Sequence, residues 1–107
     1  MDRTPLPLSL AAALALPLPD GRRSTEVFVD GDLEIRLYAP KGEDSQTPHD
    51  RDELYIVASG HGRFRVGDRI ADIAPGALLF AAAHEKHRFE NFTDDLAVWV
   101  VFYGPTK

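Results

Sequence analysis

The sequence has 107 residues and a mass of 11.8 kDa, the size of one small domain. Its formal charge of −5 disfavours binding to nucleic acid or to an anionic membrane surface. It contains no cysteine, so disulfide bonds and thiolate metal sites are excluded, and any bound metal must use histidine, carboxylate or other oxygen ligands. The core of such a chain is small, and dimerisation would be a natural supplement to it.

The N-terminal stretch, residues 1–23, is expected to form a helical or extended segment outside the main domain. Its uninterrupted apolar part covers only residues 10–16, far short of the roughly 20 residues that span a bilayer. Ser9 is a good N-cap and Pro17 a good stop signal, so the sequence predicts one or two helical turns between them. Repeated prolines and a neutral lead-in disfavour a cleaved signal sequence. We therefore expect a cytoplasmic protein without a membrane anchor.

From residue 24 to residue 107 the pattern changes to short β-like runs separated by glycine, proline or aspartate. Asp30-Gly31 is a strong hairpin signal between the first two runs. About eight runs at this spacing predict one all-β domain, an antiparallel sandwich or small barrel. The expected strands are residues 24–30, 32–40, 53–60, 63–67, 69–73, 76–83, 87–91 and 96–103.

Side chains on a strand alternate between its two faces, so residues at even spacing share one side. One such set comprises Thr47, His49, Glu53, Tyr55 and Val57. Because Val57 lies in an apolar run, we expect the shared face to point inward, unless a loop or bulge at residues 50–52 resets the count. Farther along the chain, His87, Phe89 and Asn91 share a face of another strand.

Histidine and glutamate side chains directed into an apolar interior are costly unless they are paired, hydrogen-bonded or bound to an ion. Two histidines and one glutamate that converge make the facial triad that suits Fe(II) and accepts Mn, Ni or Zn, with positions left for water or substrate. His49, Glu53 and His87 are the residues that would form it. The spacing alone leaves a second interpretation open, in which they never meet and His49 belongs to a polar, solvated loop at residues 39–50.

At these residues the chain resembles the cupins, small double-stranded β-helix barrels of the jelly-roll kind. Their first motif is G(X)5HXH(X)3,4E(X)6G. In this chain, His49 falls at its second histidine, Glu53 at its glutamate and Gly60 at its closing glycine. Thr47 stands where the first histidine is expected, and its neutral hydroxyl is a poorer ligand than imidazole.

The second cupin motif, G(X)5PXG(X)2H(X)3N, is matched more loosely. Gly67 and Pro75-Gly76 open it, and His87 and Asn91 close it at the H(X)3N spacing. The intervals from Gly67 to Pro75 and from Gly76 to His87 are longer than in the motif. The turn before His87 reads "AAAHE", without the usual proline or glycine. The resemblance covers residues 34–103, most of the chain.

The resemblance implies a metal site and its surroundings. The ligands would be His49, Glu53 and His87, holding a divalent transition metal such as Fe, Mn, Ni or Zn, with Thr47 beside a position open to water or substrate. Further residues that would line the pocket or support the ligands are Tyr55, His84, Phe89 and Gln46. For His84 an exposed position in the turn is the alternative, and Gln46 reaches inward only if the loop turns it. The resemblance also implies a homodimer packed through one sheet, which the doubly apolar run at residues 96–103 favours.

Two classes of function follow from such a site. The first is a metal-dependent enzyme that acts on a small organic molecule. Dioxygenation is one reaction that such an enzyme could catalyse. The alternative is a non-catalytic module that binds a small molecule with or without metal. A barrel whose polar residues are only hydrogen-bonded is the plainest interpretation. The sequence shows no nucleophile and base pair, and no DNA-binding segment that would indicate a transcriptional sensor.

Overall fold

A computed structural model of the protein describes residues 7–20, 22–44 and 47–107. Within these residues, each of the eight expected β segments contains a strand, and one short helix precedes them. The elements are α1 (Leu10–Leu14), β1 (Ser24–Asp30), β2 (Leu33–Tyr38), β3 (Asp52–Ser59), β4 (Gly62–Val66), β5 (Arg69–Ile73), β6 (Leu78–Ala81), β7 (His87–Glu90) and β8 (Ala97–Tyr103).

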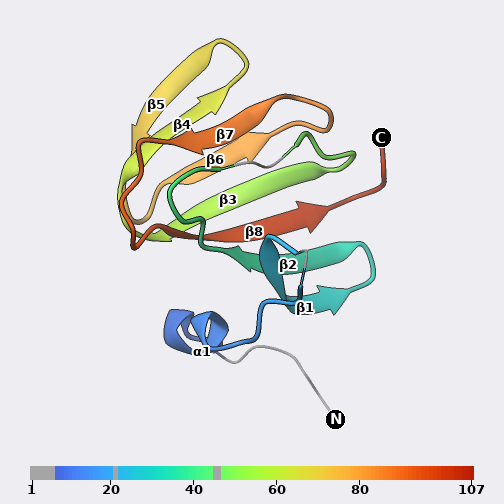
Figure 1. Ribbon diagram of the computed structural model, residues 1–107. Helices are drawn as coiled ribbons and strands as arrows, with labels where there is room; N and C mark the ends of the chain where they lie inside the picture. The colour runs from blue at the N-terminus through green and yellow to red at the C-terminus, as the bar shows by residue number, and fades with distance from the viewer. Residues whose placement is uncertain (1–6, 21, 45–46) are drawn as a thin grey trace.

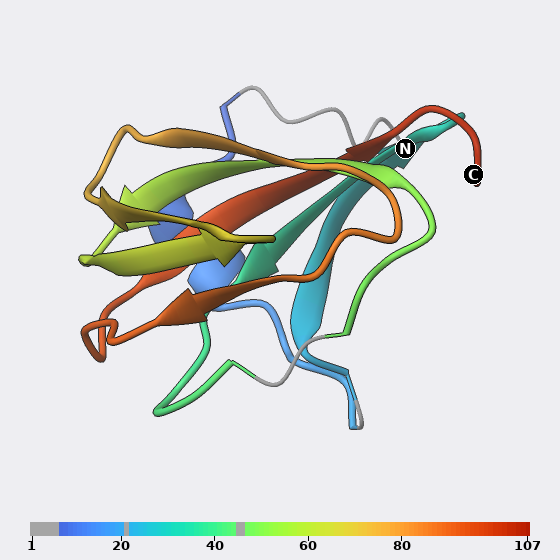
Figure 2. The same ribbon diagram turned by 90° about the horizontal axis from the view of Figure 1, so that it is seen from above.

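The strands form two antiparallel sheets, which confirms the predicted all-β fold. The larger sheet has the order β1-β2-β8-β3-β6, and the smaller sheet has the order β5-β4-β7 (Figure 1). Seen from above, β4, β5 and β7 lie over the strands of the larger sheet, so the two sheets face each other (Figure 2). Consecutive strands β3 and β4 belong to different sheets, and the chain crosses between them at residues 60–61.

The core lies between the inner faces of the two sheets and follows the predicted alternation. On β3, Tyr55 and Val57 are buried while Ile56 between them is exposed. Phe89 of β7 packs against Tyr55 with ring centroids 5.2 Å apart, and against Phe64 of β4 at 5.0 Å. Burying such aromatic side chains contributes roughly 1.5–3 kcal/mol each, and this cluster is the main apolar stabilisation between the sheets.

Two glycines serve different purposes in the turns. Gly31 has φ +59 in the β1–β2 hairpin, as the Asp30-Gly31 signal predicts, and a side chain there would meet nothing within 4 Å. Gly60 has φ +83, and a Cβ there would lie 2.5 Å from the Leu96 Cα. The chain can therefore cross from the larger to the smaller sheet only with glycine at position 60.

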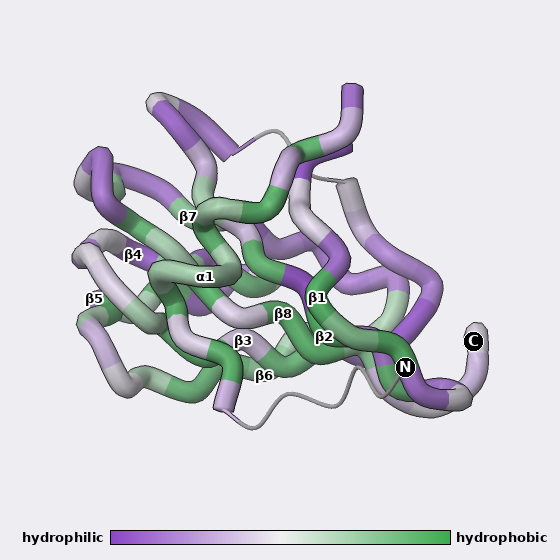
Figure 3. Tube along the Cα trace, turned by 90° about the horizontal axis from the view of Figure 1, so that it is seen from below, coloured by the Kyte–Doolittle hydropathy of each residue, from purple (hydrophilic) through white to green (hydrophobic). Residues whose placement is uncertain are grey.

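The helix α1 lies on the outer side of the larger sheet. The Ser9 side chain caps it by accepting a hydrogen bond from the Ala12 N–H at 3.1 Å, as predicted. Ala13 packs with Leu37 and Ala97, which point away from the main core. Viewed from the helix side, the strands of this sheet are mostly hydrophobic (Figure 3). Among the described residues, no helix has the length and apolar character needed to cross a membrane.

Candidate metal centre

Glu53 is a charged side chain in the interior, at the start of β3. It pairs with Ala81 of β6 and with Phe102 of β8, and its side chain is only 1% exposed. The Tyr55 hydroxyl, two residues along the same face, donates a hydrogen bond to Glu53 Oε1 at 2.9 Å. The alternation of β3 thus places a carboxylate and its hydrogen-bond donor on the inner face, as the sequence predicts.

His87 enters the same interior from the smaller sheet, at the start of β7. Its Nδ1 lies 2.8 Å from the Glu85 carbonyl oxygen, which can only accept a hydrogen bond. Nδ1 therefore carries a proton, and in the neutral ring Nε2 is left with a lone pair. This is the tautomer in which imidazole binds a metal through Nε2, with its other nitrogen oriented by a backbone carbonyl.

His49 reaches the cluster from the loop that precedes β3, so strand alternation does not govern its position. Its ring packs edge-on against Phe102 at 5.3 Å and lies 5.6 Å from the ring of His87. Its backbone carbonyl accepts a hydrogen bond from the His84 N–H at 2.6 Å, which ties the loop to the turn before β7. The expected inward direction is confirmed for Glu53 and Tyr55, but in the loop the parity count does not apply.

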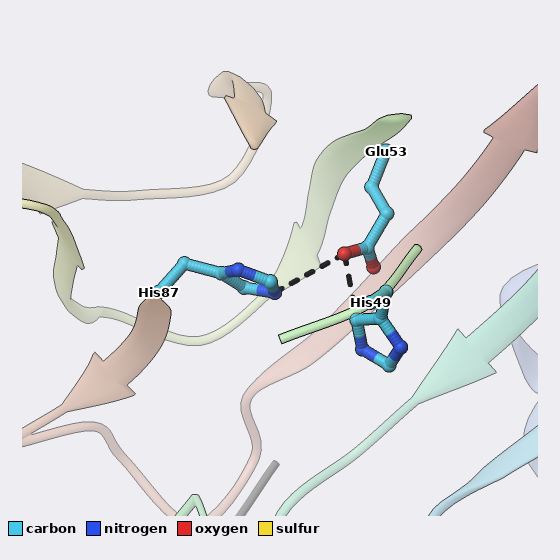
Figure 4. A group of neighbouring side chains, drawn as sticks. All are labelled: His49, Glu53 and His87. Atoms are coloured by element: carbon cyan, nitrogen blue, oxygen red, sulfur yellow. Dashed lines mark ion pairs between the residues drawn. The ribbon is translucent and has the colours of Figure 1, made fainter. Parts of the chain in front are cut away.

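The three side chains converge on one carboxylate oxygen (Figure 4). Glu53 Oε2 lies 3.1 Å from His87 Nε2 and 3.8 Å from His49 Nε2. Neither Glu53 Oε2 nor His87 Nε2 has a well-aligned hydrogen-bond partner among the described residues, although both atoms are buried. Two electron-pair donors that face each other without a proton between them are unfavourable in an apolar interior. A cation between them would remove that cost.

The separations fit a shared metal ion. Two ligands about 2.0–2.2 Å from one ion lie about 3.0–3.5 Å apart at octahedral or tetrahedral angles. The observed 3.1 and 3.8 Å are near this range, and the candidate donor atoms of all three residues lie within 4.8 Å of one another. Two imidazoles and one carboxylate make a donor set for first-row transition metals. The residues present therefore fit a divalent transition metal.

The electrostatics of His87 point the same way. Burial of the ring by itself lowers the pKa of His87, but the Glu53 carboxylate and the Glu85 carbonyl raise it by more. The net pKa therefore lies above the ordinary value for histidine. The position beside Nε2 and Oε2 attracts positive charge, whether a proton or a metal ion.

The other residues singled out in the sequence take different places. Phe89 is buried in the core beside Tyr55. Thr47 is exposed and lines a cavity that His87 also lines, on the side of the smaller sheet. His84 is exposed in the turn, where its Nε2 lies 2.6 Å from the Lys107 carbonyl oxygen, so its side chain is outside the cluster. Gln46 falls outside the described residues.

The sequence analysis missed a buried carboxylate that anchors the loop of His49. Asp44 is 8% exposed, and its Oδ1 accepts a hydrogen bond from the Tyr38 hydroxyl at 2.5 Å. Its Oδ2 accepts one from the Phe89 N–H at 2.8 Å. Burial, together with the hydrogen bond to Asp44 and its charge, raises the pKa of Tyr38 far above its ordinary range. Nothing in the acidic run around Asp44 distinguishes it from its solvated neighbours.

Comparison with known proteins places the chain among relatives. The family model described as "Cupin domain" matches residues 35–103. An uncharacterised protein of Streptomyces coelicolor, SCO3923, is 37% identical over 75 residues, which are 68% of this chain and 71% of that protein. The HTH-type transcriptional activator RhaS of Mannheimia succiniciproducens is 38% identical over 56 residues, 52% of this chain but only 21% of the activator.

A solved structure agrees with these matches. The protein TT1209 from Thermus thermophilus superposes with a TM-score of 0.68 at 26% identity, covering 92% of this chain and 98% of that one. The family model spans more than half of the present sequence, and it includes Glu53, His87 and the strands that carry them. The chain belongs to the cupin domain family.

Proposed function

We propose that this cupin binds one divalent transition metal, Fe, Mn, Ni or Zn, and is a metal-dependent enzyme that acts on a small organic molecule. The ligands are His49, Glu53 and His87. The observation that carries the proposal is the pair of buried atoms Glu53 Oε2 and His87 Nε2, 3.1 Å apart and without hydrogen-bond partners of good geometry among the described residues.

The protein's own groups prepare this site in three ways. The Glu85 carbonyl holds His87 in the tautomer that presents the Nε2 lone pair. The Tyr55 hydroxyl occupies Glu53 Oε1, which leaves Oε2 directed at the two imidazoles. The Phe102 ring packs edge-on against the His49 imidazole and supports its position beside Glu53. A metal bound there would supply Lewis-acid or redox chemistry, with oxygenation of the substrate the first reaction to test.

Metal analysis tests the site directly. Protein purified without chelator should contain about one first-row metal per chain, or gain thermal stability on addition of Fe(II), Mn(II), Ni(II) or Zn(II). His87→Ala should abolish binding, whereas His84→Asn should bind as the unmodified protein does. Asn suits position 84 because the backbone there has φ +68. Protein that neither contains nor responds to any of these metals, or unchanged binding by His87→Ala, would contradict the proposal.

The second candidate is a non-catalytic module that binds a small molecule. It is favoured by the 38% identity to part of a protein that is named as a transcriptional activator. Oxygen consumption by the Fe(II)-loaded protein across a panel of small acids, phenols and thiols separates the two candidates. Turnover with any of them supports the enzyme, and tight binding without turnover supports the module.

We also propose that the protein is a homodimer packed through the outer face of its larger sheet. The helix covers only the part of that face around Leu37 and Ala97. The rest stays open over β3 and β6, where Ile56 is 39%, Leu78 65% and Phe80 48% exposed. A second copy of the same apolar face is its simplest cover.

A further inference from the structure

The inner face of the larger sheet carries charged residues besides the candidate ligand Glu53. On β2, Glu34 lies opposite Phe102 of β8, which on its other side lies opposite Glu53 of β3. Arg36 and Tyr55 flank Val100 in the same way. Glu34 and Arg36 therefore share the face of Glu53 and Tyr55, one strand beyond β8. A charged pair on this inner face would be costly without a partner or a function.

The pairing around Glu34 leaves an excess of positive charge. Its Oε2 accepts a hydrogen bond from Arg36 at 2.7 Å, and its Oε1 lies 3.3 Å from Arg51. One carboxylate thus serves two guanidinium groups. Arg36 is held further by the Ser24 hydroxyl at 2.6 Å and the Ser24 carbonyl at 2.8 Å, and its side chain is only 7% exposed. These contacts hold a positively charged wall in place.

This wall lines a cavity of about 370 Å³ that also reaches His49. The cavity is lined by Arg22, Arg23, Ser24, Glu34, Arg36, His49, Asp50, Arg51 and Phe102. Four arginines face two carboxylates, an excess of two positive charges in a chain whose net charge is −5. General electrostatics would give this protein a negative surface, so the excess is a local feature of the cavity.

A smaller cavity of about 60 Å³ adjoins this one and is lined by two of the candidate ligands, His49 and Glu53. Arg23, Ser24, His49 and Phe102 line both cavities, and Glu53 and Tyr55 line the smaller one. Arg23 is exposed and makes no hydrogen bond or ion pair with the described residues, so its guanidinium is available to a ligand. Arg23 therefore lies where the two cavities adjoin, and the Glu53 carboxylate lines the inner one.

We propose that the ligand of this site is a small molecule with one anionic group, a carboxylate or a phosphoryl group. Arg23 binds the anionic group in the outer cavity, supported by the field of Arg22, Arg36 and Arg51. The rest of the molecule extends along Phe102 toward His49 and Glu53. Guanidinium groups match both kinds of oxyanion with paired hydrogen bonds. The orientation of the ligand toward Glu53 rests on the proposed metal centre, but binding of the anion does not.

The test compares two anions with a neutral molecule that has nearly the shape of one of them. Isothermal titration calorimetry with benzoate, its neutral isostere benzamide and phenyl phosphate is carried out on metal-free and Zn(II)-loaded protein. We expect benzoate or phenyl phosphate to bind about tenfold or more tightly than benzamide in both forms. The tighter of the two anions identifies the head group. Equal affinities for charged and neutral probes, or no binding of either anion at millimolar concentration, would overturn the inference.

Variants assign the effect to Arg23. Arg23→Gln should weaken binding of the anion about tenfold, and Arg23→Lys should lose less because it keeps the charge. Arg69→Gln, an exposed arginine on β5 outside both cavities, should change nothing. Unchanged affinity in Arg23→Gln contradicts the proposed role. If the protein prefers the anionic probes but does not bind any of the metals, the proposed metal centre is wrong and the anion site stands. If it binds metal but does not prefer the anionic probes, the anion site is wrong and the metal centre stands.

Discussion

Tyr55 and Glu53 lie two residues apart on one strand, and this spacing gives the candidate site its internal support. The Tyr55 hydroxyl donates to Glu53 Oε1, while the ring packs against Phe64, Phe89 and His87. The hydroxyl orients the carboxylate, and the ring fills the core around it. A hydrogen bond to a ligating group typically changes metal affinity by about one to two orders of magnitude.

Tyr55→Phe separates these two contributions, because it removes the hydroxyl and keeps the ring. We expect Zn(II) affinity to fall about tenfold or more, since Glu53 Oε1 loses its donor and the carboxylate can turn away from the imidazoles. Competition titration with a chromophoric chelator measures the change. Tyr103→Phe is the matched control, since Tyr103 is 38% exposed at the end of β8. Equal affinity in Tyr55→Phe and the unmodified protein would contradict an orienting role for the hydroxyl.

Asp44 fixes the segment that follows β2 through two buried hydrogen bonds. Asp44→Ala leaves the Tyr38 hydroxyl and the Phe89 N–H without their shared acceptor in the interior. We expect the free energy of unfolding to fall by about 2–4 kcal/mol. Urea denaturation measures it. Glu43→Ala, at the exposed neighbouring position, should stay within about 0.5 kcal/mol of the unmodified protein. Equal effects of the two substitutions would show that Asp44 does not anchor the loop.

At the scale of the elements, the site depends on segments that join the two sheets. Glu53 belongs to the larger sheet and His87 to the smaller one, so their distance is set by how the sheets face each other. The crossing at Gly60, between β3 and β4, is one determinant of that arrangement. There the chain passes so close to Leu96 that a single added carbon would clash with its backbone.

Two glycine substitutions separate backbone strain from close packing. Gly60→Ala adds a Cβ 2.5 Å from the Leu96 Cα and places alanine at φ +83, so we expect a loss of about 3 kcal/mol or more in unfolding free energy. Gly31→Ala places alanine at φ +59 with nothing within 4 Å, so only the backbone cost of about 1–2 kcal/mol remains. Urea denaturation compares them. A Gly60→Ala variant no less stable than Gly31→Ala would contradict the close approach.

At the scale of the whole molecule, the larger sheet has two different faces. Its inner face carries much of the core, the candidate ligand Glu53 and part of the wall of the cavity lined by Arg36. Its outer face carries apolar residues in register across neighbouring strands. Phe80 lies opposite Leu54, which lies opposite Val101. Among the described residues, α1 and Leu8 just before it cover part of this face, and we propose a second copy over the remainder.

Light scattering coupled to size exclusion tests the dimer. The unmodified protein should have twice the mass of one chain at micromolar concentration. Leu78→Lys combined with Phe80→Lys should give a monomer, because two charges from each chain would have to be buried in the interface. Val29→Lys is the control, since Val29 is 50% exposed on β1 and, paired with Glu34, lies on the other face of the larger sheet. A monomeric unmodified protein, or a double variant that remains dimeric, would contradict this interface.

The strands, the hairpin at Gly31 and the inward face of Glu53 and Tyr55 follow from the sequence because they depend on local rules. Side chains alternate along a strand wherever the chain is extended, and glycine takes the positive φ of a tight turn. Another local rule, a capping serine followed by a terminating proline, predicted the short helix between Ser9 and Pro17. The β-like run at residues 87–91 predicted that His87 lies on a separate strand and shares a face with Phe89, and both side chains are buried on β7.

The meeting of His49 with Glu53, the burial of Asp44 and the cavity around Arg23 depend on long-range contacts and have no local signal. His49 lies in a loop without periodicity, and its position comes from Phe102 and the turn at His84. The tautomer of His87 that leaves a lone pair on Nε2 is selected by the Glu85 carbonyl, whose direction is set by the fold of that turn. The local sequence pattern therefore determines which face of each strand points inward. The packing of the two sheets determines which inward side chains come close enough to share a ligand.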